Sequence, residues 1–381
     1  MKKSMFISMC VAMFALYSCS QDESENTEVL TDDVCHQITS EQAVRNAYSF
    51  LNAFNGENTR SSVTNRTVSE VVAYTKNGRQ LEKTRSDDNE EIAFYAVNFA
   101  DDNGFVIAAA DSRNEPVYAY VEKGNYNGED TTNNPGFELF LKNIVAKTTG
   151  NCDESLRRTY ATEKTRTSVG PYLSTLWGPG SPYNQHTQYT TVGSPAVALA
   201  QIAAYFQYPS SLSFTDYANN SIYTALDWTS ILSECGNNNG QLTQINTNSS
   251  QVSYFMSYIE GYTNAESLYL STECLYRMYC LGYNLAAYLL YPLQNDTQEA
   301  NVRSYLDQGK LIYARGQIYS SDPTQITGLG HAWVIDGYNG NYFHCNWGWY
   351  GAYDGYYLST GFVPYTGADY SYKRAYMYVY H

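Results

Sequence analysis

Three segments of this chain carry side chains that together could act on a carbonyl group. His331 lies within Gly330–Tyr338, and Asn346 follows fifteen residues later. A third segment, Gly193–Gln201, places Ser194 directly before a proline. Histidine is the side chain most often used for proton transfer, and a serine hydroxyl attacks when a base removes its proton. The pairing of histidine with a downstream asparagine favours a catalytic position for His331 over a purely structural one.

Sequence periodicity predicts the elements that must position these side chains. Alternation of residue types over Gly330–Tyr338 indicates a strand that leaves a glycine turn. The apolar run from Pro195 to Tyr205 predicts a helix, with Ser194 as its N-cap. In that role the Ser194 hydroxyl would accept a hydrogen bond from a backbone amide two or three residues further on. Capping alone would then explain this serine without any catalytic function.

With the tail Phe206–Pro209, these segments resemble the streptopain family of secreted bacterial cysteine peptidases, peptidase family C10, which have a papain-like fold. The resemblance implies that His331 is the general base, that Asn346 orients its imidazole, and that Trp347 shields this pair from water. The family has glycine followed by cysteine where this chain has glycine followed by Ser194. Ser194 therefore stands at the position of the family's nucleophile.

Departures from the family's pattern predict impaired or absent cysteine-peptidase activity. A thiol at a helix N-terminus can have its pKa lowered from about 8.5 to roughly 3.5–7.5, but the hydroxyl of Ser194 is not ionised there. Pro179 stands where the family has a glutamine that helps hold the oxyanion, and proline has no donor. Pro195 replaces a small apolar residue. Tyr350 replaces the glycine after Trp349, where we expect its ring to fill part of the substrate cleft.

Two other functions stay open. Ser194 could be a serine nucleophile with His331 as base, which would make the protein an active hydrolase. Alternatively, the chain could be a peptide-binding or protease-inhibitory module. Other nucleophiles are less suitable, since strand alternation turns Cys345 away from the neighbouring asparagine. Cys274 and Cys280 lie in a helical stretch away from the three motifs.

The N-terminal unit, residues 36–150, is predicted to be a small α+β domain. A helix over Ser40–Asn55 precedes four β-rich runs. A second helix over Pro135–Ala146 follows an asparagine cap. The runs Tyr95–Phe99 and Gly104–Arg113 resemble the family's Spi-like inhibitory propeptide.

The rest of the chain completes an α+β protein in which a papain-like catalytic domain follows the small propeptide domain. Residues 151–168 are polar and basic, which is typical of an exposed linker open to processing. Residues 169–381 form the streptopain-like peptidase domain, with a helix around Ser267–Met278 and a strand-rich end from Leu311. The length predicts two domains, each with its own core.

The chain begins with features of a bacterial lipoprotein signal. A basic start is followed by the apolar run Met5–Tyr17 and then by Cys19 after a small residue. Residues 1–19 would be the signal peptide with Cys19 as lipidation site, and the polar residues 20–35 a flexible tether. An ordinary cleaved signal with an incidental cysteine is the alternative. The predicted location is extracytoplasmic, with a lipid anchor in the bacterial outer membrane or at the cell surface.

Charge and cysteine spacing restrict the partners. The formal net charge is −15 and the isoelectric point about 4.7, which argues against nucleic acid as a partner. The eight cysteines match no zinc pattern and no dense disulfide framework, and we expect no cofactor. The expected partners are a peptide or protein substrate or ligand and the protein's own propeptide. The membrane would be contacted only through the lipid anchor.

Overall fold

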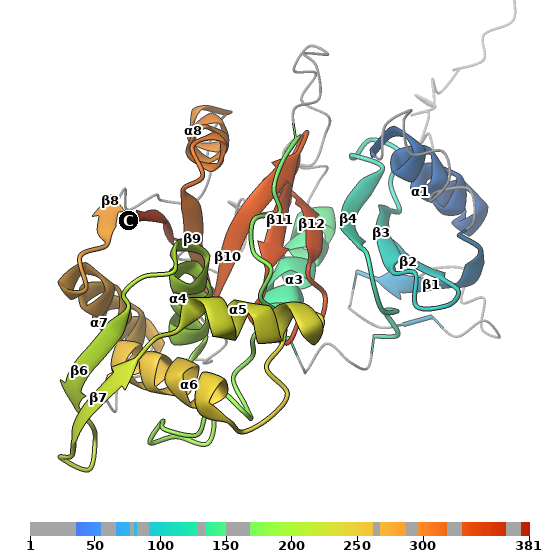
Figure 1. Ribbon diagram of the computed structural model, residues 1–381. Coiled ribbons are helices and arrows are strands. Elements are labelled where there is room, and N and C mark those ends of the chain that lie inside the picture. Colours follow the sequence, from blue (N-terminus) through green and yellow to red (C-terminus); the bar gives the residue numbers. More distant parts are fainter. Residues whose placement is uncertain are drawn as a thin grey trace, which may run out of the picture. The chain divides into compact units, whose positions relative to one another are not determined.

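Figure 1 shows the protein as a computed structural model. It describes residues 36–54, 66–76, 80–81, 91–128, 134–149, 168–261, 267–286, 296–317, 330–362 and 375–381. The predicted signal peptide, Cys19, the tether and nearly all of the predicted linker lie outside these residues.

A large sheet runs through residues 36–381, which form one unit. Its strands are β1 (Val68–Thr75), β2 (Ile92–Phe99), β3 (Phe105–Ala109), β4 (Val117–Val121), β5 (Ser168–Val169), β8 (Asn284–Ala286), β9 (Leu311–Gln317), β10 (Gly330–Asn339), β11 (Tyr342–Asn346), β12 (Gly355–Leu358) and β13 (Ala375–Tyr380). In space they follow the order β1-β2-β3-β4-β12-β11-β10-β9-β13-β8, and β5 pairs with β10. A separate hairpin joins β6 (Ser211–Thr215) to β7 (Ser221–Ala225).

Helices pack on both faces of this sheet. They are α1 (Ser40–Phe54), α3 (Pro135–Thr149), α4 (Ser194–Phe206), α5 (Trp228–Asn237), α6 (Thr247–Glu260), α7 (Ser267–Cys280), α8 (Asp296–Asp307) and the short 3-10 helix η4 (Ser359–Phe362). The helices predicted near residues 40, 135, 195 and 267 are therefore confirmed. Asn134 is the asparagine that caps α3, because its Oδ1 accepts hydrogen bonds from the amides of Gly136 and Phe137, both at 3.1 Å.

The two parts of the chain share one sheet and one of its two core clusters, whereas the length predicted a separate core for each domain. Strand β4 of the N-terminal part pairs with β12 of the C-terminal part. On one face of β10, Trp333 and Ile335 belong to a core cluster that also holds Phe137 of α3. On the other face, Ala332 and Val334 belong to the cluster built by α4–α7. In Figure 1, α3 and α4 both lie near β10, in agreement with their contacts.

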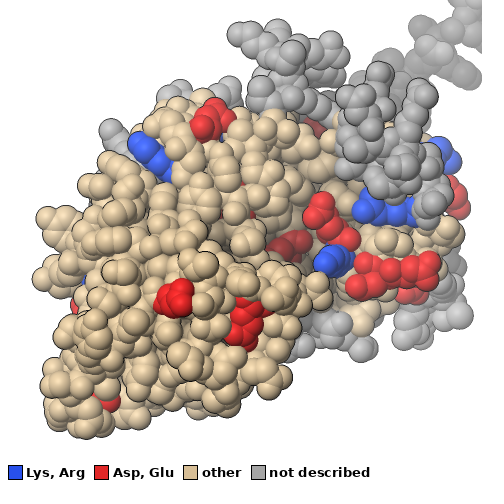
Figure 2. Space-filling model, in the orientation of Figure 1, with Lys and Arg blue, Asp and Glu red and all other residues tan. Residues whose placement is uncertain are grey.

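Basic residues are scarce in the C-terminal part. No lysine or arginine occurs from residue 167 to residue 276. Figure 2 accordingly shows a largely uncharged surface over β6, β7, α5 and α6, with a few acidic groups. None of the helices in the described ranges is long and apolar enough to cross a bilayer.

Candidate active site

The structure corrects the predicted role of Ser194 as a helix cap. Gly193 is the N-cap residue, with φ −65° and ψ 141°, and no side chain caps this end of α4. Its carbonyl accepts hydrogen bonds from the amides of Ala196 at 3.0 Å and Val197 at 3.2 Å. The Ser194 hydroxyl instead accepts a bond from the amide of Ala332 in β10 at 3.1 Å. The cap lies one residue earlier than predicted because glycine is tolerated there and the serine finds its partner on a neighbouring strand.

A buried carboxylate fixes the loop in front of Ser194. Glu260, at the end of α6 and only 2% exposed, accepts hydrogen bonds from the amide of Gly193 at 2.7 Å and from the Thr187 hydroxyl. Burial raises the pKa of Glu260, and these two bonds partly oppose that shift. The carboxylate satisfies donors that would otherwise lose their solvent, so it holds the segment that leads into α4.

His331 lies at the start of β10, is 4% exposed, and is bonded to the backbone of Trp347. Its Nε2 lies 2.7 Å from the Trp347 carbonyl oxygen. Because a carbonyl only accepts, Nε2 carries the proton and the neutral ring keeps its lone pair on Nδ1. Burial lowers the pKa of His331 to about 4, and the bond to Trp347 offsets this only in part. The imidazole is therefore neutral at pH 7.

The amide of Asn346 is bonded elsewhere. Its Oδ1 accepts hydrogen bonds from Gln201 Nε2 at 2.9 Å and from the amide of Gly348 at 3.0 Å. Its Nδ2 donates to the carbonyl of Thr175 at 2.9 Å. Within the described contacts, the predicted bond from the His331 imidazole to this side chain is not made.

The four predicted site residues nevertheless lie on adjoining elements. Ser194 begins α4, His331 stands in β10, and Asn346 and Trp347 end β11 and follow it. Trp347 is 1% exposed, and its ring centroid lies 6.4 Å from that of His331. In the part of the chain that the structure describes, no hydrogen bond joins the side chains of Ser194, His331 and Asn346 to one another. The predicted site residues lie on adjoining elements, but the hydrogen bonds between their side chains that proton transfer requires are not formed.

The first turn of α3 packs against the histidine and the tryptophan. A Cβ atom at Gly136 would lie 2.3 Å from a ring carbon of Trp347 and 2.6 Å from Cδ2 of His331. The cap residue Asn134 also donates to the carbonyl of Ala352 at 2.7 Å, in the turn that follows Trp347. The N-terminal part of the chain thus contacts the predicted base directly.

The side chain of Tyr350 packs over the backbone on both sides of Pro179. A Cβ atom at Gly178 would lie 2.4 Å from the ring of Tyr350, and the Tyr350 hydroxyl accepts a hydrogen bond from the amide of Gly180 at 2.6 Å. The carbonyl of Pro179 accepts a bond from the amide of Val192 at 2.8 Å. The segment is rigidly held, but at Pro179 it offers no side-chain donor.

Residues 177–357 match the peptidase C10 family, and residues 35–147 match the Spi protease inhibitor family. The chain thus has the domain pair of a streptopain-like protein, a Spi-like unit followed by a peptidase C10 unit. This confirms the predicted streptopain resemblance and the predicted fold of a papain-like unit preceded by a Spi-like unit.

Relatives and a solved structure agree with the family. Streptopain of Streptococcus pyogenes is 25% identical over 306 residues, which cover 68% of this chain and 72% of streptopain. The thiol protease/hemagglutinin PrtT of Porphyromonas gingivalis is 24% identical over 305 residues, 70% of this chain but 34% of PrtT. A mutant fragment of Prevotella intermedia prointerpain A superposes with a TM-score of 0.52 at 20% identity. The superposition covers 82% of this chain and 98% of the fragment, and it supports the fold.

Sequence reasoning missed one residue at the centre of this C10 site. Gln201 is fully buried in α4, and its Oε1 accepts hydrogen bonds from the Thr175 hydroxyl at 3.0 Å and the Trp177 amide at 3.1 Å. Its Nε2 donates to Asn346. The available signal was a single polar residue inside the buried run Pro195–Ala204.

Two of the three rival cysteines are unsuited to catalysis, while the third, Cys280, is exposed. Cys345 and Cys274 are fully buried, and burial raises the pKa of each thiol well above its usual range. Cys345 lies in the core on the α3 face, while its neighbour Asn346 reaches Gln201 of α4. The prediction that strand alternation turns Cys345 away from the asparagine is therefore confirmed.

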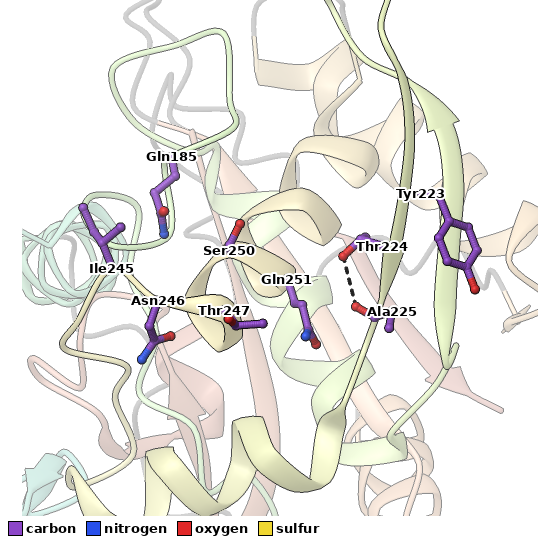
Figure 3. A pocket seen from close by; sticks show the side chains of 9 residues that line it. All are labelled: Gln185, Tyr223, Thr224, Ala225, Ile245, Asn246, Thr247, Ser250 and Gln251. Carbon is purple, nitrogen blue, oxygen red and sulfur yellow. Dashed lines mark hydrogen bonds between the residues drawn. The ribbon is translucent and has the colours of Figure 1, made fainter.

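A pocket of about 560 Å³ lies apart from these residues (Figure 3). It is lined by Gln185, Tyr223, Thr224, Ala225, Ile245, Asn246, Thr247, Ser250 and Gln251. None of the predicted site residues lines it. Among the described residues, no cluster of histidine, cysteine and carboxylate side chains could hold a metal ion.

Proposed function

We propose that this streptopain-like protein is an extracytoplasmic, lipid-anchored peptidase homologue with impaired or absent cysteine-type endopeptidase activity. It binds peptide or protein segments beside α4 without efficient cleavage, and its own propeptide restrains the site. The sequence signals for the anchor are Cys19 and the apolar run before it. The similarity to a protein named as a hemagglutinin, PrtT, supports the extracytoplasmic part.

One observation carries the proposal: an alcohol occupies the nucleophile position, and no hydrogen bond among the described residues joins it to the predicted base. Ser194 Oγ is bonded to the Ala332 amide, and His331 Nε2 is bonded to the Trp347 carbonyl. Serine must lose its proton during attack, whereas a cysteine in this setting is already ionised. Loss of the family's glutamine at Pro179 removes an oxyanion donor as well, a change that typically costs about 10²–10³ in rate.

Contacts of the N-terminal part support restraint by the propeptide. Gly136 packs against His331 and Trp347, and Asn134 ties the cap of α3 to Ala352. The low pKa of His331 follows from this burial, and a neutral imidazole cannot stabilise a neighbouring anion.

The direct test is digestion of casein by the purified protein, with mass spectrometry of both protein and substrate. We expect casein to stay intact and the chain to remain uncut between Arg157 and Arg166, because it cannot process its own linker. Turnover comparable to that of an active C10 peptidase, or self-processing in pure solution, would exclude the proposal.

The alternative of a serine hydrolase has a separate test. A fluorophosphonate probe would label Ser194 if His331 could activate it, and the Ser194→Ala variant would lose that label. We expect equal background labelling of both proteins. The inhibitory-module alternative predicts that the purified protein slows casein digestion by an active C10 peptidase.

A further inference from the structure

Arg315 carries an unpaired nitrogen in the interior. It stands in β9, and its Nη1 is buried without a hydrogen-bond partner. The residue as a whole is partly exposed, so solvent reaches another part of its side chain. Burying a polar cationic group without a partner costs free energy. A structure tolerates such a group most readily where something else, such as a ligand, supplies the missing acceptor.

The other described cations of the C-terminal part have partners. Arg277 pairs with Glu273 at 2.7 Å, and Arg303 pairs with Glu299 at 3.2 Å. Lys310 lies over two tyrosine rings, 4.4 Å from the nearer centroid. Among the lysine and arginine residues that the structure describes from residue 168 onward, Arg315 is therefore the one whose side chain has no ion pair, hydrogen bond or ring contact.

Strand register places Arg315 next to the start of α4. Arg315 is directly opposite Ala332 in the β9–β10 ladder, and the amide of Ala332 is bonded to Ser194. Side chains of directly opposed residues share one face, with Cβ atoms about 4.5–5.5 Å apart. Leu311 and Tyr313, at even spacing from Arg315, belong to the α4 cluster, so the guanidinium is on the α4 face.

The propeptide helix lies on the other face. Gly316, the neighbour of Arg315, faces Leu139 of α3, because a Cβ atom there would lie 2.6 Å from a methyl group of Leu139. The α3 contact with the sheet therefore does not cover the side chain of Arg315. Its face is instead the one that carries Ser194.

We infer that Arg315 determines the ligand class of this site by binding a carboxylate of the peptide held beside Ser194. This inference rests on the proposed peptide-binding function. A guanidinium offers a planar fork that matches a carboxylate, and such bonds are among the strongest available to a polar side chain. The N-terminus of α4 adds positive potential on the same side. The carboxylate of Glu260, which lies in front of Ser194, is already bonded to Gly193 and Thr187.

The test uses immobilised full-length protein and three mixtures of N-acetylated hexapeptides. In the first, one central position is glutamate and the C-terminus is amidated. In the second, glutamine replaces the glutamate. The third has the glutamine and a free C-terminal carboxylate. All other positions vary over uncharged residues, and mass spectrometry measures the fraction of each mixture that is retained.

We expect about tenfold greater retention of a carboxylate-bearing mixture than of the amidated glutamine mixture. Comparison of the first and third mixtures shows whether a side chain or a chain end supplies the carboxylate. The preference should disappear in Arg315→Gln and decline in Arg315→Lys, which keeps the charge but loses the fork. The control Arg45→Gln removes the same charge from exposed α1 and should keep the preference.

Two results would overturn the inference in distinguishable ways. Equal retention of all three mixtures by the unaltered protein would refute the carboxylate preference and leave peptide binding in place. Retention of none of the three mixtures would refute both the carboxylate preference and the proposed peptide binding. Thermal unfolding gives an independent readout: Arg315→Gln should keep or raise the melting temperature, since it removes an unpaired buried nitrogen. A clear decrease would mean that Arg315 supports the fold, contrary to the inference.

Discussion

His331 Nε2 lies 2.7 Å from the carbonyl oxygen of Trp347 and is not bonded to the side chain of Asn346. The amide of the same tryptophan donates to Asp354 at 2.8 Å. The peptide groups on both sides of Trp347 therefore link the predicted base to Asp354, an acid in the turn beyond it. This link holds the imidazole away from the partner that the C10 family would assign to it.

Restoring the family's residues at positions 194 and 179 should restore peptidase activity in steps. Ser194→Cys supplies a thiol that can ionise at the start of α4. Adding Pro179→Gln supplies a side-chain oxyanion donor and should raise the rate of casein cleavage by a further 10²–10³, roughly. The single variant Pro179→Gln should stay inactive, and His331→Ala should abolish the gain. A folded but inert double variant would contradict this view of the site.

A side chain at Gly136 should release His331 from the propeptide helix. In Gly136→Ala the new methyl group would meet the rings of Trp347 and His331 at distances that no packed core allows, so α3 must shift. The pKa of His331 should then rise from about 4 toward 6.5, as measured by NMR titration of the imidazole. Gly236→Ala is the matched control, since nothing lies within 4 Å of that position. An unchanged His331 pKa would show that α3 does not cause its burial.

His331 should make the fold sensitive to acid. Its pKa is about 4 in the folded protein against a reference of 6.5, so the unfolded chain binds a proton that the folded protein refuses between these values. Stability is therefore lost as the pH falls from 6.5 to 4, by at most about 3 kcal/mol. Urea unfolding of His331→Gln should show a flatter dependence in this window. Identical pH profiles for the variant and the unaltered protein would rule this out.

Asp354→Asn should stabilise the protein above pH 7. Burial raises the pKa of Asp354 to about 7, although the bond from Trp347 and the nearby His344 lower it in part. Its Oδ2 is buried without a partner. Ionisation therefore costs folding free energy as the pH rises from 3.8 to 7, and the asparagine amide avoids that cost while it still accepts from Trp347.

We expect Asp354→Asn to gain about 1–2 kcal/mol at pH 8 in urea unfolding. Asp354→Ala should instead lose about 1–3 kcal/mol, because the Trp347 amide is left without its acceptor. Equal losses in both variants would show that the charged form of Asp354 is required.

The local sequence predicted the helices and strands better than it predicted the long-range contacts that they make. The β-rich run Tyr95–Phe99 lies within β2, Ile92–Phe99, as predicted, because β-branched and aromatic residues predominate there. The predicted cap of α4 was wrong because the hydroxyl of Ser194 bonds to the amide of Ala332, 138 residues further along the chain. Spacing along the sequence does not encode such a contact.

The candidate site shows the same difference between what local sequence predicts and what tertiary contacts determine. Residue types and motif order brought Ser194, His331 and Asn346 into one region, and the structure places them on adjoining elements. One hydrogen-bond partner of Asn346 is Gln201, 145 residues away, and that contact depends on how α4 packs against the sheet. A motif identifies the chemistry that is possible, while tertiary packing decides which bonds form.

The pairing of β4 with β12 has a consequence for maturation. Ala119, Tyr120 and Val121 of β4 pair with Gly355–Tyr357 of β12 at the junction of the two parts of the chain. If proteolysis removed the N-terminal part, β12 would lose the neighbouring strand β4. Its backbone N–H and C=O groups on that side would then be unpaired. Open sheet borders recruit foreign strands and promote aggregation. Removal of the N-terminal part would thus leave β12 as an aggregation-prone edge strand, which the remaining peptidase-like domain must protect in another way.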